Sequence, residues 1–89
     1  MTLLLADLPL GARALVRQLR SPADGLDAQQ LQRLGELGFL PGEPVQLIRR
    51  GPGGREPLAV LVGDTMLALR LLEARCVEVT QDAEALAAA

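Results

Sequence analysis

The chain has 89 residues, of which 49% are hydrophobic, and it carries a net charge of −2. This length predicts one domain with a single modest core. The slightly acidic balance excludes a typical nucleic-acid binder, because such proteins carry a clear excess of basic side chains. Cys76 is the one cysteine, so no internal disulfide can form and a cytosolic protein is expected.

The first eleven residues are apolar, but no basic residue leads them and Asp7 interrupts them. They therefore match neither a signal peptide nor a membrane-spanning helix. Residues 8–11 predict a turn into the first strand. That strand is expected over residues 12–19, where apolar side chains and arginines alternate. Leu15 and Leu19 break the alternation, so we expect a bulge or a second covered face.

Residues 26–42 predict one short helix with both ends specified. Asp27 suits the N-cap, and Gln30, three residues later, completes a capping box. Gly38 is placed to end the helix in a left-handed conformation, with Phe39 folding back onto the last turn. So short a helix is marginal alone, and we expect it to lie on a sheet.

Two further residue patterns in this segment carry expectations. Pro41 and Gly42 suit the two central positions of a type II turn, which would reverse the chain into the next strand. Gly35 lies inside the predicted helix, where glycine costs about 1 kcal/mol relative to alanine. We expect the helix to approach the sheet so closely there that a side chain would not fit.

The second half of the chain predicts four more strands, separated by glycine-containing turns. They are expected at residues 45–50, 58–62, 65–69 and 77–80. Residues 70–75 are too few for a packed helix and suit a 3₁₀ turn before the last strand. With the helix in the first connection, the pattern predicts a small, mainly β, five-stranded barrel. The domain is expected to span residues 1–80, with residues 81–89 as a frayed tail.

The sequence argues against an enzyme. It has no histidine, which is the simplest general base near neutral pH. The single thiol lacks a histidine to activate it. The eleven Asp and Glu residues are scattered among arginines and apolar residues, as on a solvated surface. The glycines of residues 51–54 do not lead from a strand into a helix, so they do not predict a phosphate-binding loop.

A metal site has little support in the sequence. Cys76 and Glu78 are two residues apart on the last predicted strand and would share a face. They supply at most half of a tetrahedral shell, and a cysteine in a strand is more often a core residue. No cofactor is expected. Cys76 and Glu78 leave open only the weak binding of a divalent metal.

The segment LGELGFLPGEPVQLI and the segment PLAVLVGDTMLALRLLEARCVEV resemble the FeoA family of small cytoplasmic partners of the ferrous iron transporter FeoB. The resemblance extends over nearly the whole chain. It implies an SH3-like barrel, with the helix inserted after the first strand. It also implies a likeness to the C-terminal domain of DtxR-type repressors. Members of the family are often described as binding transition metals, but this chain lacks histidine and a cysteine pair.

Binding of a protein partner is the function that remains. A groove for proline-rich peptides needs several aromatic rings, and Phe39 has the only aromatic ring in the chain. We expect instead an apolar patch rimmed by cations, called here the predicted patch. Its members are Phe39, Leu40, Arg49, Arg50, Arg70, Leu71 and Leu72. Because Leu71 and Leu72 are neighbours, both cannot point inward.

The resemblance implies that this patch contacts the cytoplasmic GTP-binding region of a ferrous iron transporter. The protein would then be a non-enzymatic cytoplasmic accessory that binds no nucleic acid and does not insert into the membrane. Exposed leucines also allow a weak homodimer. The alternative is a stand-alone metal-sensing or scaffold domain, related to the repressor domains and binding a transition metal ion.

Overall fold

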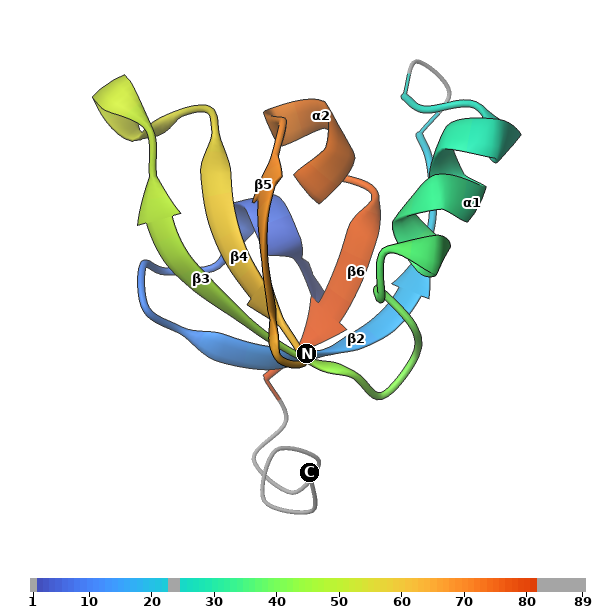
Figure 1. The fold of residues 1–89 in the computed structure, drawn as a ribbon, viewed down its shortest axis with the longest axis horizontal. Coiled ribbons are helices and arrows are strands. Elements are labelled where there is room, and N and C mark those ends of the chain that lie inside the picture. Colours follow the sequence, from blue (N-terminus) through green and yellow to red (C-terminus); the bar gives the residue numbers. More distant parts are fainter. Residues whose placement is uncertain (1, 23–24, 82–89) are drawn as a thin grey trace.

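The computed structural model describes residues 2–22 and 25–81 of the chain. Six antiparallel strands form one sheet in the order β1-β6-β2-β3-β4-β5 (Figure 1). The strands are β1 (Thr2–Leu4), β2 (Arg13–Leu19), β3 (Pro44–Arg50), β4 (Leu58–Val62), β5 (Thr65–Leu69) and β6 (Val77–Thr80). The helices are η1 (Leu5–Asp7), α1 (Ala28–Glu36), η2 (Pro52–Gly54) and α2 (Leu71–Ala74). Of the expected tail, residues 82–89 lie outside the described part.

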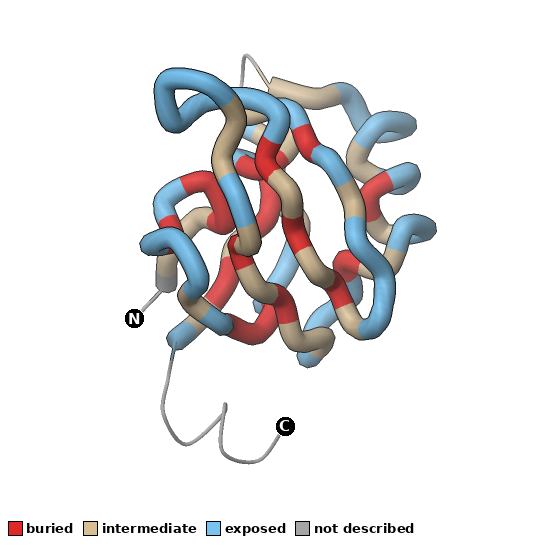
Figure 2. The backbone as a smooth tube through the Cα atoms, turned by 60° about the vertical axis from the view of Figure 1, so that its left-hand side comes forward, coloured by how far each residue is buried: buried red, intermediate tan, exposed pale blue. Residues whose placement is uncertain are grey.

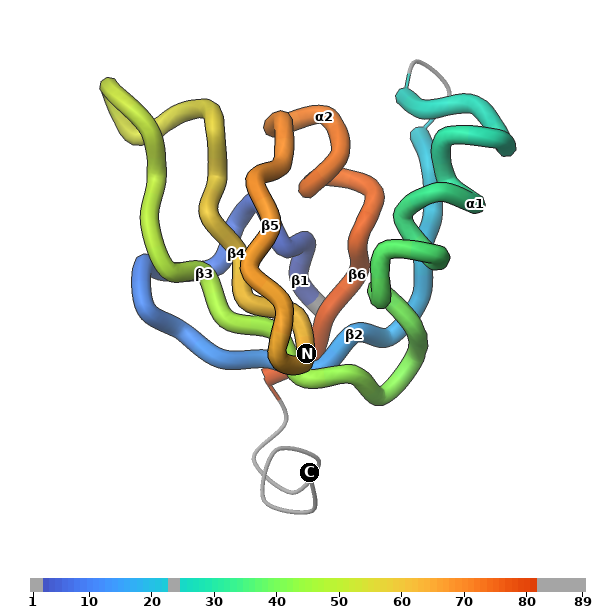
Figure 3. The backbone as a smooth tube through the Cα atoms, in the orientation of Figure 1, coloured from blue at the N-terminus to red at the C-terminus, as the bar shows by residue number. Residues whose placement is uncertain are grey.

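The expected five strands are all present, but the sequence did not predict β1. This strand pairs with β6, so that Leu3 lies opposite Val79, and the two run side by side in Figure 3. Leu5 and Leu8 then follow into the core and are fully buried. The leading segment is therefore part of the fold. Three residues are too few to show an alternating pattern, and the pairing with β6 decides their conformation.

The sheet curves strongly but does not close. In the described chain, β1 and β5 lie at its two edges and each pairs with one neighbour. The mainly β prediction is confirmed, whereas the expected closed five-stranded barrel is replaced by an open sheet of six strands. Closure would need β5 to pair with a second strand, and in the described chain it pairs with β4 alone.

The core lies inside the curve of the sheet. Buried and half-buried residues alternate along β3 and β4, as the tube in Figure 2 shows. The register of β2 against β6 shifts between Val16 and Gln18, which confirms the expected bulge. The alternate residues of β4 are only half-buried, so this strand is fully covered on one face only.

Both ends of α1 form as the sequence predicts. The Asp27 carboxylate accepts the N–H of Gln30 at 2.8 Å, and the Gln30 side chain accepts the N–H of Asp27 at 2.9 Å. At the other end Gly38 has φ +119°, and the N–H of Phe39 donates to the carbonyl of Leu34 at 3.2 Å. These bonds pair backbone groups that a helix end leaves open.

The turn after α1 is also confirmed, but the explanation expected for Gly35 is wrong. The N–H of Glu43 donates to the carbonyl of Leu40 at 3.0 Å, and Gly42 has φ +89°, as a type II turn requires. A Cβ on Gly35 would meet only Leu19 Cδ1, at an ordinary 3.8 Å. The helix does not approach the sheet too closely there for a side chain.

The turn before the last strand is α-helical rather than 3₁₀. In α2 the N–H of Ala74 donates to the carbonyl of Arg70, and that of Arg75 to Leu71, each at 3.0 Å. The Glu73 carboxylate also accepts the N–H of Arg70 at 2.7 Å. Acceptors for the first open donors stabilise a single α turn, although four residues alone would not hold it.

Candidate partner-binding surface

The structure separates the predicted patch into two parts. Phe39 is buried, and Leu40 lies in the turn after α1. The helix end lies beside Val62, because a Cβ on Gly38 would be 3.8 Å from its Cγ2. The remaining patch residues lie at the opposite end of the strands, where β5 ends at Leu69. Because strands rise about 3.3 Å per residue, the five-residue β4 separates the two parts by roughly 13 Å.

The three arginines of the predicted patch differ in role. The half-buried Arg50 donates from Nη2 to the carbonyl oxygens of Ala6 and Leu8, at 2.7 and 3.1 Å. It thereby holds η1 and the chain that follows it against β3. Arg49 and Arg70 are exposed. The position of Arg50 thus fits a structural role, and only the other two arginines lie fully on the surface.

The two leucines of α2 point in different directions, as expected. Leu71 packs against the core, whereas the side chain of Leu72 is 40% exposed. The N–H of Leu71 donates to the Glu56 carboxylate at 2.7 Å, which ties α2 to the loop before β4. Leu72 is therefore the member of this pair that a partner can reach.

The two residues weighed as metal ligands have other partners. Cys76 is fully buried, and its Sγ donates to the carbonyl of Leu72 at 3.4 Å. The Glu78 carboxylate accepts from the Gln18 amide at 2.9 Å and lies 3.7 Å from Arg20. Within residues 2–22 and 25–81, His, Cys, Asp and Glu side chains form no group of three that could hold a metal ion.

A groove runs between α1, β5 and the start of α2, with a volume of about 310 Å³. We call it the edge groove. Its apolar lining comes from α1 and β5, and charged side chains stand among its other lining residues. The apolar residues include Leu34, Leu37, Leu67 and Leu69, and the charged residues are Arg33, Arg70 and Glu73. The sequence did not reveal the groove, because it exists only where the sheet fails to close.

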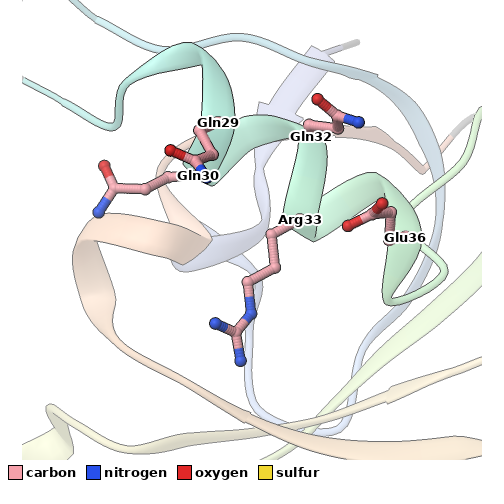
Figure 4. A pocket seen from close by; sticks show the side chains of 5 residues that line it. All are labelled: Gln29, Gln30, Gln32, Arg33 and Glu36. Atoms are coloured by element: carbon pink, nitrogen blue, oxygen red, sulfur yellow. The ribbon is translucent and has the colours of Figure 1, made fainter.

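A second hollow, of about 560 Å³, lies over the outer face of α1. Figure 4 shows its five lining residues, all from this one helix: Gln29, Gln30, Gln32, Arg33 and Glu36. Three of the five are amides, which do not act as general acids or bases near neutral pH. All five are exposed. The hollow is a polar helix surface and not a water-excluding reaction site.

Comparison with known proteins identifies the family. A family model for the FeoA domain matches residues 3–81. The chain belongs to the FeoA family. FeoA from Stenotrophomonas maltophilia, solved as a zinc complex, is 44% identical over 88% of this chain and 89% of that one, with a TM-score of 0.75. That protein is described as a prokaryotic SH3 domain protein and suggested as an activating factor of bacterial ferrous iron transport.

Other FeoA structures agree with the same fold. FeoA from Chlorobium tepidum is 27% identical, with a TM-score of 0.72, over 86% of this chain and 68% of that chain. T. acidophilum IdeR, at 18% identity and a TM-score of 0.66, covers 91% of this chain and 34% of its own, and shows the fold alone. No protein with curated function matches the chain. The SH3-like prediction is thus confirmed for this FeoA-family member, whose described helices are too short or too polar to span a membrane.

Proposed function

We propose that this FeoA-family protein is a non-enzymatic cytoplasmic accessory of ferrous iron uptake. It acts by contact with the cytoplasmic GTP-binding region of a FeoB-type transporter. Family membership and the role suggested for the S. maltophilia relative support this assignment. The chemistry of the chain supports it as well, because a sequence without histidine and with one buried thiol offers little for catalysis or iron transfer.

The distribution of exposed apolar side chains carries the proposal. Of the five large hydrophobic residues that are exposed in the described part of the chain, four belong to the end of α1 and the turn after it, to β5 or to α2. These four are Leu37 (39% exposed), Leu40 (52%), Met66 (54%) and Leu72 (40%). Leu37 lines the edge groove, and Leu40 and Leu72 lie at opposite ends of the strands, so the four offer a partner separate apolar anchors and not one continuous patch.

A binding titration tests this function. The purified GTP-binding region of the organism's own FeoB-type transporter is titrated against the wild-type protein and against Leu37→Asp and Leu72→Asp. A charge placed on an apolar contact loses buried area and leaves a desolvated carboxylate, so we expect binding to weaken about tenfold or more. Both side chains are already partly exposed to solvent, so the thermal unfolding midpoint of the two variants should stay close to that of the wild type.

The matched control is Leu10→Asp. Leu10 is 65% exposed, and the turn that holds it bonds through the N–H of Gly11 to the carbonyl of Leu47 in β3, away from the edge groove. This variant should bind as the wild type does. A wild-type protein that does not bind the transporter region at all would contradict the proposed function. Equal weakening by all three variants would indicate a general charge effect and reject the surface.

A further inference from the structure

Strand β5 presents an open edge of the sheet. Val62 and Thr65 flank a two-residue turn and lie opposite each other, so they form a hydrogen-bonded pair. The pattern alternates along the strand, and Leu67 and Leu69 therefore also turn their peptide groups toward β4. The N–H and C=O groups of Met66 and Ala68 point away from β4. In the described chain β5 has no second neighbouring strand to receive them.

Nothing in the sequence of β5 protects this edge. Proteins usually shield an exposed edge with a charged side chain, a proline, a bulge or a very short strand, or cover it with a helix or loop. Here the edge groove separates β5 from α1. The five residues Thr65–Leu69 contain no charge and no proline, and their register with β4 runs without a shift. The outward N–H and C=O groups occur at every second residue of a strand that rises about 3.3 Å per residue. The occupant that matches this spacing is another extended backbone.

The edge groove matches the side chains of such an occupant. Leu67 and Leu69 alternate with the edge residues and lie on the face that lines the groove, across from Leu34 and Leu37 of α1. Alternate side chains of a strand added beside β5 would point to that same face. Leu34 and Leu69 are already buried, so alternate side chains of an added strand would meet Leu67 and Leu37, which are accessible, and apolar residues fit there.

The charges around the edge groove favour an acidic partner. Arg33 on α1 and Arg70 at the end of β5 both line it. Glu73 is the one acidic lining residue, and its carboxylate already accepts the N–H of Arg70 at 2.7 Å. The edge groove therefore has two guanidinium groups and one carboxylate in its lining, which leaves an excess of positive charge there. A carboxylate on the incoming segment would be attracted by it.

We propose that the transporter's cytoplasmic region supplies an extended segment that adds to β5 as a further strand. Apolar residues at alternating positions of this segment occupy the edge groove, and a flanking acidic residue pairs with Arg33 or Arg70. The inference rests on the proposed function and names the element of this chain that performs it. It also explains why the sheet remains open at β5.

Proline at the edge provides a sharp test. Ala68→Pro removes an N–H that points away from β4, so the sheet should survive, while the incoming strand loses a donor and meets the proline ring. The matched control is Ala68→Val, which keeps the N–H and suits a strand. In titrations with the transporter's GTP-binding region, Ala68→Pro should weaken binding about tenfold or more, and Ala68→Val should bind within about twofold of wild type. Met66→Pro, at the other outward-pointing residue, should repeat the loss if Ala68→Pro proves unstable.

The outcomes separate this inference from the function on which it rests. If the wild type binds and both folded proline variants bind equally well, strand addition is wrong and the proposed function stands. If the wild type does not bind, both fail. If instead the isolated protein forms a dimer that Ala68→Pro abolishes and the transporter region does not displace, then a second copy occupies the edge and the inference is overturned.

Discussion

At one edge of the sheet β1 has only three residues, and the chain after it enters the core; at the other edge β5 has five residues and borders a groove. Leu5 and Leu8 anchor the first edge, and Arg50 binds the carbonyl oxygens beside them. No comparable anchor covers β5 in the described chain. The chain that follows β1 is thus anchored in the core, whereas β5 has no such anchor and keeps the outward backbone groups of Met66 and Ala68 available.

The largest effect should come from removing the anchor beside β1. Leu5 is fully buried, and Leu5→Ala leaves a cavity beneath η1 that should lower the free energy of unfolding by about 2–5 kcal/mol. Chemical denaturation measures the loss. Leu10→Ala, in the exposed turn nearby, is the control and should stay within about 0.5 kcal/mol of wild type. A loss below 1 kcal/mol at Leu5 would mean that the burial of η1 contributes little to the fold.

A smaller effect should follow from Arg50→Met. The methionine keeps most of the apolar stem but removes the donors to Ala6 and Leu8. Carbonyl groups left without a donor should cost about 1–3 kcal/mol of unfolding free energy. The same substitution at the exposed Arg49 should change stability by less than about 0.5 kcal/mol. Transporter binding separates two roles for Arg50: a folded Arg50→Met variant that loses binding as well would return Arg50 to the contact surface.

The smallest effect concerns α1 beside the open edge and should be stabilising. A methyl group on Gly35 meets only Leu19 Cδ1 at 3.8 Å, so Gly35→Ala should raise the free energy of unfolding by up to about 1 kcal/mol. Gly35 does not line the edge groove, and transporter binding should remain at the wild-type value. Gly38→Ala is the opposing control, because φ +119° is strained for alanine and the variant should be destabilised. A loss of stability in Gly35→Ala would show that the helix packs more tightly than described.

What the sequence could predict was what depends on neighbours in the chain. The caps of α1 and the turn after it were found because Asp27, Gln30, Gly38 and Gly42 act on backbone groups within a few residues of themselves. The β2 bulge was one of two expectations drawn for a similar reason, because Leu15 and Leu19 break a two-residue period. These features would be visible in any chain with the same local order.

The remaining features depend on partners distant in sequence. Strand β1 exists because it meets β6 more than seventy residues later, and Arg50 reaches carbonyl groups more than forty residues earlier. The edge groove joins a helix to a strand thirty residues on. The predicted patch combined three short segments between residues 39 and 72, and the sheet places Leu40 and Leu72 at opposite ends of its strands. Leu37 lines the groove and is 39% exposed. An apolar residue outside the buried face of the helix is a signal in the sequence that could have pointed to this groove.

Amide hydrogen exchange at the open edge tests strand addition to β5 at single backbone groups. Exchange of the backbone N–H groups of Met66 and Ala68 is followed by NMR in the free protein and with a saturating amount of the transporter's GTP-binding region. If a strand adds to β5, both N–H groups exchange rapidly in the free protein and about tenfold or more slowly in the complex, because the added strand accepts hydrogen bonds from them. Binding that protects other surfaces and leaves these two amides exchanging at their free rates would contradict strand addition.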